Sequence, residues 1–172
     1  MTKLSKRISA RNDFTLIPVK KFIIFSIGEE EYAIDILKVN EISGSIKALS
    51  ITKIADAPEH IKGIINLHDR IIPIVDLRVF YHLQPILNDE VKIIIILDIM
   101  KKMVGIAVDN VSDIIELTEK QIKPAPDFFT NIYSNYIQGI GTLDKKILII
   151  LDVEKLLFSD DVKINQFMNK DS

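Results

Sequence analysis

The sequence contains no cysteine and no tryptophan, and its aromatic residues amount to only 7%. Without thiols the chain has no cysteine nucleophile, disulfide, thiolate zinc site or iron–sulfur cluster, and this composition suits a reducing compartment. The formal net charge of −2 at pH 7, with histidine neutral, does not provide the strong basic field that non-specific nucleic-acid binding requires. These deficits exclude thiol chemistry and disfavour a nucleic-acid-binding role.

Long apolar segments are also missing. The longest unbroken aliphatic runs are Ile93–Leu97 and Ile147–Leu151, whereas a membrane-spanning helix needs about 20 such residues. The segment Met1–Asp13 is basic and polar and lacks the apolar stretch of a signal peptide. The sequence therefore predicts a cytoplasmic protein with no direct insertion into a membrane.

Branched aliphatic residues are abundant. The chain has 34 isoleucines and 10 valines among 172 residues, and such residues are stiff in helices and pack well on sheets. Short apolar or alternating runs, separated by turn residues, predict a mainly β fold of barrels or a sandwich. The predicted strands are Phe22–Ile27, Tyr32–Ile36, Ile64–Leu67, Ile71–Val75, Val91–Ile99, Val104–Val108, Ile114–Leu117, Tyr136–Gly141 and Ile147–Val153.

Helices are predicted to be few and short. Asp76–Tyr81 and Asp152–Phe158 each begin with an aspartate that caps a helix N-terminus. One helical turn is expected within Leu37–Ile42. Residues 1–20 are expected to form a flexible extension, and residues 159–172 a C-terminal tail with a marginal amphipathic helix.

An internal repeat organises the chain. Residues 61–77 align without a gap on residues 137–153, which lie 76 positions later. The match extends backwards, because Val39–Ile42 corresponds to Val111–Ile114. We infer a duplicated β unit, with repeats at about 22–82 and 91–158.

The two repeats are expected to share one hydrophobic core. A unit of about 70 residues is only marginally stable by itself. In addition, the segment Val91–Leu97, which is apolar except for Lys92, requires cover on both faces, as it would have between two packed barrels. We therefore treat residues 21–158 as one domain.

No catalytic or metal-binding pattern is present. His60, His68 and His82 have no paired-ligand spacing and are interpreted as surface residues. Asp76, Asp109 and Asp152 follow apolar strands, where aspartate usually satisfies a turn or caps a helix. The pair Gly139 and Gly141 lacks the third glycine of a phosphate-binding loop. We predict no enzyme activity, no cofactor and no metal site.

Two groups of residues remain as candidates for a docking face. Val39, Glu41 and Ile42 follow the second strand, and Gly63, Asn66 and His68 lie along the hairpin that begins the first long repeat. Core packing is an equally good explanation for Val39 and Ile42, and ordinary turn chemistry is the alternative for residues 66–69.

At these residues the sequence closely resembles the CheW family of chemotaxis coupling proteins. The resemblance runs in order from Phe22 to Phe158, and no one motif is decisive. The matching segments are Phe22–Gly28, Tyr32–Ile42, Ile61–Leu67, Pro73–Arg78, Val104–Asp113, Ile122–Pro126, Tyr136–Gly139 and Leu151–Leu157.

This resemblance implies an all-β fold with a few short helices, built as two intertwined five-stranded SH3/OB-like β-barrels that share a hydrophobic core. It also implies a non-catalytic adaptor that links the cytoplasmic tips of methyl-accepting chemoreceptors to the regulatory domain of the histidine kinase CheA. Such a protein is cytoplasmic and is recruited to membrane-associated receptor arrays, in which other CheW-like proteins are further ring partners.

The resemblance also implies two sets of contact residues. The receptor-binding positions are Val39, Glu41, Ile42, Gly63, Asn66 and His68. The kinase-binding positions are Ile51, Lys53, Ile54, Asp127 and Phe128. The alternative for Phe128 is that its ring packs into its own barrel.

One departure from the family pattern concerns the receptor-binding positions. The family usually has Asn-Leu-Arg-Gly where this chain has Asn66-Leu67-His68-Asp69. Arginine offers a permanent charge and a rigid fork of donors, whereas histidine is mostly neutral at pH 7. The hypothesis is that this protein serves a subset of receptors, or is one of several coupling proteins in its cell.

A second class of function fits the same fold. Small OB-type barrels bind single-stranded nucleic acid by stacking bases on aromatic side chains above a basic groove. Here the basic residues do not alternate with aromatic ones. Barrel topology alone favours this alternative, and fold does not decide function.

Overall fold

The computed structural model describes residues 17–43, 50–78, 93–125 and 135–159, together with Val162 and Ile164. Several predictions of the sequence analysis fall outside these residues: most of the N-terminal extension, most of the tail helix, the end of the predicted helix at Asp76–Tyr81, and three candidate residues. Those candidates are His82, Asp127 and Phe128.

Strands dominate the described residues, and they form two sheets. The strands are β1 (Val19–Ile27), β2 (Glu30–Asp35), β3 (Val39–Ser43), β4 (Ile61–Leu67), β5 (Arg70–Asp76), β6 (Ile93–Ile99), β7 (Lys102–Val108), β8 (Asn110–Thr118), β9 (Ile122–Lys123), β10 (Ile137–Leu143) and β11 (Lys146–Leu151). The short helical elements are the 3-10 helices η1 (Ile36–Lys38) and η4 (Glu119–Gln121) and the α-helix α2 (Val153–Leu157).

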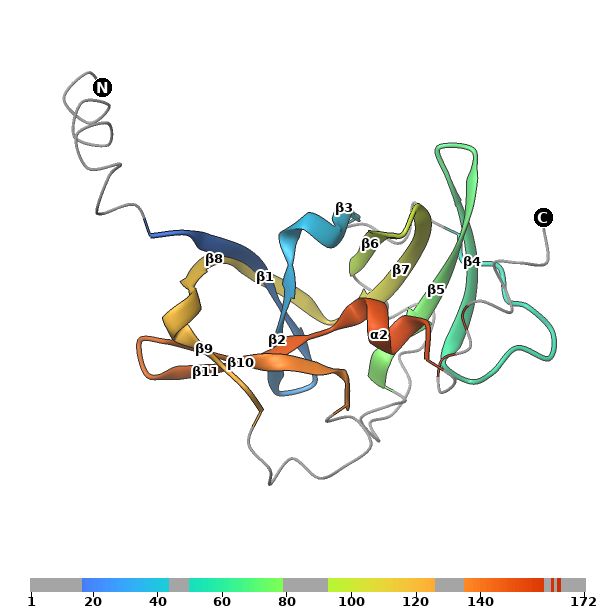
Figure 1. Cartoon of the computed structure of the whole chain (residues 1–172). Coiled ribbons are helices and arrows are strands. Elements are labelled where there is room, and N and C mark those ends of the chain that lie inside the picture. The colour runs from blue at the N-terminus through green and yellow to red at the C-terminus, as the bar shows by residue number, and fades with distance from the viewer. Residues whose placement is uncertain are drawn as a thin grey trace, which may run out of the picture.

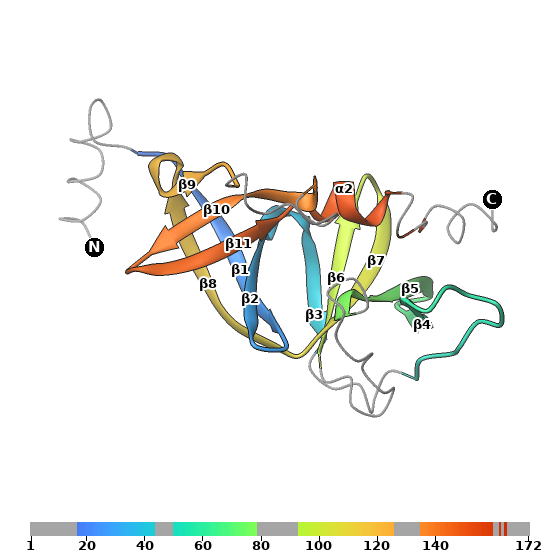
Figure 2. The same cartoon turned by 90° about the horizontal axis from the view of Figure 1, so that it is seen from below.

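Each sheet curves into a barrel, and the two barrels lie side by side (Figure 1). We call the sheet with strand order β8-β1-β2-β11-β10-β9 barrel 1, and the sheet with order β3-β6-β7-β5-β4 barrel 2. Helix α2 lies between the two barrels (Figure 2). The all-β prediction with a few short helices is therefore confirmed, although barrel 1 gains a sixth strand in the two-residue β9.

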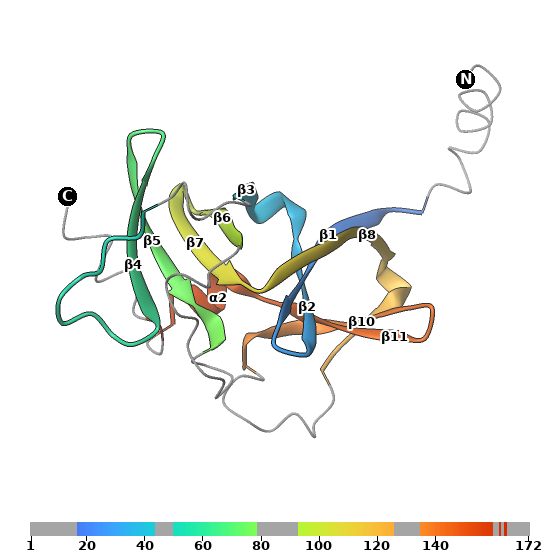
Figure 3. The same cartoon turned by 180° about the vertical axis from the view of Figure 1, so that it is seen from behind.

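The two barrels are intertwined, because each takes strands from both halves of the chain. Barrel 1 combines β1 and β2 of the first half with β8 to β11 of the second. Barrel 2 combines β3, β4 and β5 of the first half with β6 and β7 of the second. The chain passes from barrel 2 to barrel 1 where β7 continues into β8 (Figure 3).

The duplication seen in the sequence is present in the strand register. Ile64 lies opposite Pro73 in the β4–β5 hairpin, and Ile140 lies opposite Ile149 in the β10–β11 hairpin. In both hairpins the register shifts by a bulge at the same place, just before the glycine of the first strand. The two halves therefore adopt the same local structure 76 positions apart.

Alternate side chains of the central strands serve different cores. In β6, Ile94 and Ile96 face a core inside barrel 2, whereas Ile95 and Leu97 face a core shared by both barrels. In β1, Ile23 joins the shared core while its neighbours Phe22 and Ile24 line a separate core of barrel 1. This arrangement confirms the shared core and explains why the run 93–97 is apolar at every position.

The helical turn predicted within Leu37–Ile42 is partly wrong. Only Ile36–Lys38 form a 3-10 turn, capped by Asp35, whose Oδ1 accepts a hydrogen bond from the backbone N–H of Leu37 at 2.9 Å. The following residues form β3, because they pair with β6 from the other half of the chain. Local propensity gives no information about such a distant partner.

The N-terminal boundary is also different from the prediction. Val19 and Lys20 belong to β1 and lie opposite Thr118 and Leu117 of β8. The strand therefore begins before residue 21, where the flexible extension was predicted to end. By contrast, the helix predicted at Asp152–Phe158 is present as α2, and Asp152 Oδ1 accepts from the backbone N–H of Lys155 at 3.0 Å.

Candidate protein-interaction surfaces

The described part of the chain holds no cluster of three or more histidine, aspartate or glutamate residues that could bind a metal ion. Within the same residues, no helix has the length and apolar character needed to cross a membrane.

The predicted receptor-binding residues come from two outer strands of barrel 2. Val39, Glu41 and Ile42 lie on β3, whereas Gly63, Asn66 and His68 lie on β4 and its hairpin turn. We call this set the β3–hairpin surface. β3 and β4 stand at opposite ends of the strand order, yet Glu41 Oε1 is 3.4 Å from His68 Nε2. This contact joins the two edges of the curved sheet.

Exposure separates the packing explanation from the docking explanation at two positions. Val39 is half-buried and packs against the shared core. Ile42 is 41% exposed and faces outward from the same strand. Core packing therefore partly explains why residue 39 is apolar, but it does not explain the apolar side chain of Ile42. Asn66 and His68 are exposed as well.

The structure shows why residue 63 is a glycine, which the sequence did not reveal. Gly63 is buried and has φ +147°, and a Cβ atom added here would lie 2.2 Å from the carbonyl oxygen of Thr52. Thr52 and Ile64 exchange two backbone hydrogen bonds, of 2.8 and 2.9 Å. The absence of a side chain at Gly63 allows this pairing, which brings Ile51 against the core of barrel 2.

Three of the predicted kinase-binding residues, Ile51, Lys53 and Ile54, lie on the segment around Thr52 that pairs with β4. Ile51 and Ile54 are half-buried, and Lys53 is exposed. The structure thus brings these three residues beside β4 through the Thr52–Ile64 bridge. The other two candidates, Asp127 and Phe128, lie outside the described residues.

The interpretation of all histidines as surface residues is wrong for His60. This side chain is buried, and its Nε2 lies 2.6 Å from the carbonyl oxygen of Val162, to which it donates. Val162 and Ile164 follow α2 and are fully buried in the shared core. The repeat carried a signal, because His60 aligns with Tyr136, another ring that is buried in the other half.

The three aspartates that follow strands act as predicted, with one addition. Asp76 accepts from the backbone N–H of Arg78 at 2.9 Å, and Asp152 caps α2. Asp76 is also fully buried, with Lys62 Nζ at 3.6 Å from its Oδ2. Asp109 Oδ2 accepts from the backbone N–H of Gly28 at 2.6 Å.

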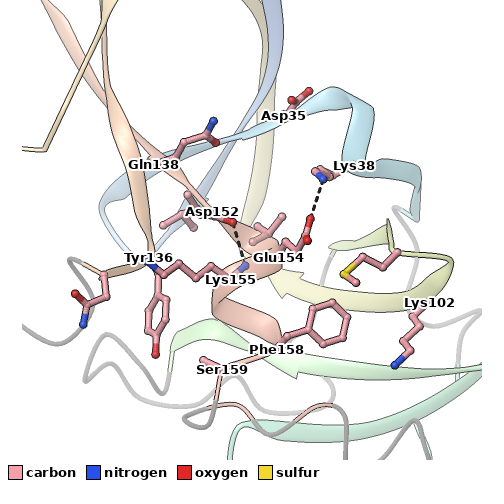
Figure 4. Close-up of a pocket in the computed structure, with 14 residues that line it drawn as sticks. Asp35, Lys38, Lys102, Tyr136, Gln138, Asp152, Glu154, Lys155, Phe158 and Ser159 are labelled. Atoms are coloured by element: carbon pink, nitrogen blue, oxygen red, sulfur yellow. Dashed lines mark hydrogen bonds and ion pairs between the residues drawn. The ribbon is translucent and has the colours of Figure 1, made fainter.

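A groove that the sequence analysis missed runs between the two barrels along α2 (Figure 4). It has a volume of about 1340 Å³ and is lined by residues from β2, η1, the β6–β7 hairpin, β10 and α2. Lys38 on η1 forms an ion pair with Glu154 of α2 at 3.0 Å, and Lys102 Nζ lies 5.6 Å from the centroid of the Phe158 ring. We call it the inter-barrel groove.

The inter-barrel groove combines charges of both signs with apolar side chains, including Met100 and Phe158. A groove with such a lining can accept a protein segment that has one apolar face and polar edges. Its residues come from distant parts of the sequence, so no local motif could have predicted it.

Comparison with known proteins gives a consistent result. Residues 21–161 match the family described as CheW-like domain. The chain is 45% identical over 145 residues to the chemotaxis protein CheW of Klebsiella aerogenes, covering 84% of this chain and 86% of that protein. It is 31% identical over 137 residues to the probable chemotaxis protein CheW of Rhizobium etli, covering 80% and 86%.

A solved structure is similar as well. The crystal structure of the scaffolding protein TtCheW from Thermoanaerobacter tengcongensis superposes with a TM-score of 0.71 and 36% sequence identity. The match covers 83% of this chain and 95% of that chain. The similarity therefore extends over both barrels.

Proposed function

Because this chain belongs to the CheW-like domain family, we propose that it is a non-catalytic adaptor of bacterial chemotaxis, which links chemoreceptor tips to the histidine kinase CheA. The observation that carries the proposal is the family match over residues 21–161. The adaptor is cytoplasmic in this proposal and is recruited to membrane-associated receptor arrays. Its work is to hold partners in a defined geometry, so its contact surfaces determine its function.

For the receptor, the proposed contact is the β3–hairpin surface. A chemoreceptor tip is a helical hairpin, and grooves recognise helices through apolar anchors that are flanked by polar contacts. Ile42 supplies an exposed apolar anchor. Glu41, Asn66 and His68 supply polar groups elsewhere on the β3–hairpin surface. Gly63 contributes indirectly, because it allows the close approach that shapes this edge of barrel 2.

For the kinase, the proposed contacts are Ile51, Lys53 and Ile54 on one side and Asp127 and Phe128 on the other. Two separate contacts allow one adaptor to touch two kinase regulatory domains, or other CheW-like proteins, within a ring. Such signalling interfaces are often at or below about 800 Å² per partner, so modest affinity is expected for each one.

Co-sedimentation with a CheA-type kinase and receptor tips tests the proposal. Ile42→Lys places a charge at the exposed anchor, and we expect it to weaken receptor binding at least tenfold. Ile147→Lys is the matched control, because Ile147 is 65% exposed on β11 of the other barrel. Phe128→Ser is expected to reduce array assembly while receptor binding stays intact.

Unchanged receptor binding by Ile42→Lys, or an equal loss in Ile147→Lys, contradicts the receptor assignment. Full array assembly by Phe128→Ser contradicts the second kinase contact. The family match favours the adaptor over the alternative of an OB-type single-stranded nucleic-acid-binding module. Titration with single-stranded DNA at several salt concentrations is expected to detect no steep salt-dependent binding.

A further inference from the structure

In the intertwined fold the first half of the chain pairs with the second half; we call these unlike halves, and two first halves or two second halves like halves. The corresponding strands of the two halves nevertheless have the same pairing register. Ile42 of β3 lies opposite Ile95 of β6, and Ile114 of β8 lies opposite Ile23 of β1. In the repeat, which is offset here by 72 positions, Ile114 corresponds to Ile42 and Ile95 corresponds to Ile23. The backbone would therefore also allow like halves of two copies to pair, with Ile42 of one copy opposite Ile23 of another.

Two ion pairs connect the unlike halves at corresponding places. Arg78 Nη1, just after β5, lies 2.7 Å from Asp109 Oδ2, between β7 and β8. Lys38 Nζ, between β2 and β3, lies 3.0 Å from Glu154 Oε2, just after β11 (Figure 4). Arg78 and Glu154 occupy the same position in the two repeats, 76 residues apart. Lys38 and Asp109 occupy the same connection and differ by one residue in the 72-residue alignment.

Each half of the chain contributes charges of only one sign to these two ion pairs. Both residues in the first half, Lys38 and Arg78, are positive, whereas both residues in the second half, Asp109 and Glu154, are negative. In the observed pairing, opposite charges meet at both places. If two first halves paired, Lys38 would meet Arg78, and if two second halves paired, Asp109 would meet Glu154. Like charges at such distances repel, and such repulsion is a general source of pairing specificity.

Another ion pair between the halves lacks this property. Lys146 of β11 lies 2.8 Å from Glu31 of β2. The first-half residue that corresponds to Lys146 is Arg70, which is also positive. Glu31 would therefore attract its partner in either pairing, so this ion pair does not distinguish the two arrangements.

We propose that Lys38, Arg78, Asp109 and Glu154 determine which halves pair, by favouring unlike halves within one chain and disfavouring the union of like halves from two chains. All four side chains are less exposed than those of the surface pair Lys21–Glu116, so solvent screens them less. The proposal concerns assembly of the fold and does not depend on the adaptor function.

The decisive variant is Arg78→Glu combined with Glu154→Arg. It leaves the amino-acid composition and the net charge unchanged, but it makes both contacts between unlike halves repulsive and both contacts between like halves attractive. Size-exclusion chromatography with light scattering is expected to show an apparent association constant for dimerisation at least tenfold higher than that of the unmodified protein.

Two further variants control the experiment. Adding Lys38→Glu and Asp109→Arg to the double variant makes the contacts between unlike halves attractive again, so the fourfold variant is expected to return to the original mass. Exchanging the surface pair by Lys21→Glu and Glu116→Lys moves the same number of charges between β1 and β8. We expect this exchange to leave the dimerisation constant unchanged.

Engineered disulfides identify the pairing directly, because the chain has no cysteine of its own. Ser26 lies opposite Asn110 across β1 and β8, and the residue that corresponds to Ser26 in the second half is Asp98. Residues opposite each other in such strands are close enough for a disulfide. Ser26→Cys with Asn110→Cys therefore reports unlike halves by a bond within one chain, whereas Asp98→Cys with Asn110→Cys reports like halves by a bond between chains.

A dimer of the double variant with the bond between Cys residues at 98 and 110 supports the proposal. A monomer that forms the bond between 26 and 110 at the original yield overturns it, and so does equal dimerisation of the Lys21/Glu116 exchange. If the double variant does not fold, circular dichroism of the fourfold variant decides: recovery of the β spectrum supports the proposal, and continued loss of structure contradicts it.

Discussion

At the scale of single residues, Gly63 shows how one missing side chain shapes a surface. Its φ of +147° is a conformation that other residues rarely adopt, and the site has no room for a Cβ beside Thr52. We expect Gly63→Ala to lower the free energy of unfolding by about 2–5 kcal/mol, from backbone strain and overpacking. Urea unfolding followed by circular dichroism measures this loss.

The repeat provides the matched control for Gly63. Gly139 occupies the same place in the other half, where an added Cβ would lie 3.0 Å from the carbonyl oxygen of Lys123. This contact is less severe, so Gly139→Ala is expected to cost less than Gly63→Ala. An equal or smaller loss for Gly63→Ala would contradict the account of the Thr52 contact.

His68 and Glu41 show what residue-level sequence analysis could and could not predict. The replacement of the family's arginine by histidine was visible in the sequence. The 3.4 Å contact of His68 with Glu41 was not, because it depends on curvature that brings the outer strands of barrel 2 together. The placement of His60 against Val162 was missed because the two residues lie 102 positions apart in the sequence.

At the scale of elements, the hairpin turns combine tight geometry with residues that fit it poorly. The β6–β7 turn places Met100 at φ 53° and Lys101 at φ 67°. Two positive φ values in succession are typical of a type I′ turn, which favours asparagine and glycine. These two residues therefore hold a strained conformation in a hairpin that borders the inter-barrel groove.

Relieving that strain is expected to stabilise the protein. A left-handed residue other than glycine costs roughly 1–2 kcal/mol, and the extra freedom of glycine in the unfolded chain offsets part of the gain. We expect Lys101→Gly to raise the free energy of unfolding by about 0.5–1 kcal/mol, measured by thermal and urea unfolding.

Lys120→Gly provides the comparison, since Lys120 lies in the 3-10 helix η4 and does not have a positive φ. There the same change is expected to lower stability by about 0.5–1 kcal/mol. A loss of stability in both variants would show that the β6–β7 turn is not strained by Lys101.

Element prediction succeeded where the signal was local and failed where it was not. The Asp152 cap and the apolar residues of α2 were sufficient to predict that helix. The strand Val39–Ser43 was taken for part of a helical turn, because its partner β6 lies in the other half of the chain. The two-residue β9 and the helix η4 were not predicted at all.

At the scale of the whole molecule, the shared core couples the two barrels. Leu97 of β6 is fully buried in this core, together with side chains from β1 and β2 of the other barrel. A large-to-small change here should therefore destabilise both barrels at once. We expect Leu97→Ala to cost about 2–5 kcal/mol and to lower amide protection in barrel 1 and barrel 2 equally.

Ile72→Val is a milder comparison within the separate core of barrel 2, with an expected cost of about 0.5–1.5 kcal/mol. Native-state hydrogen exchange follows the two barrels separately. Protection lost only in barrel 2 after Leu97→Ala would indicate that the barrels unfold independently and that the core is not shared energetically.

The amino-acid sequence by itself determined that the chain is β-rich and duplicated, that its central strand is covered on both faces, and that it resembles a known family. These properties follow from composition, alternation and repetition, which act along the chain. Only the tertiary structure decided that β3 pairs with β6 and β8 with β1 across the two halves. The same holds for the close approach of Thr52 to Gly63 and for the ion pairs that join positive residues of the first half to negative residues of the second. Those features depend on contacts between residues far apart in sequence, and such contacts arise only when the two halves fold together.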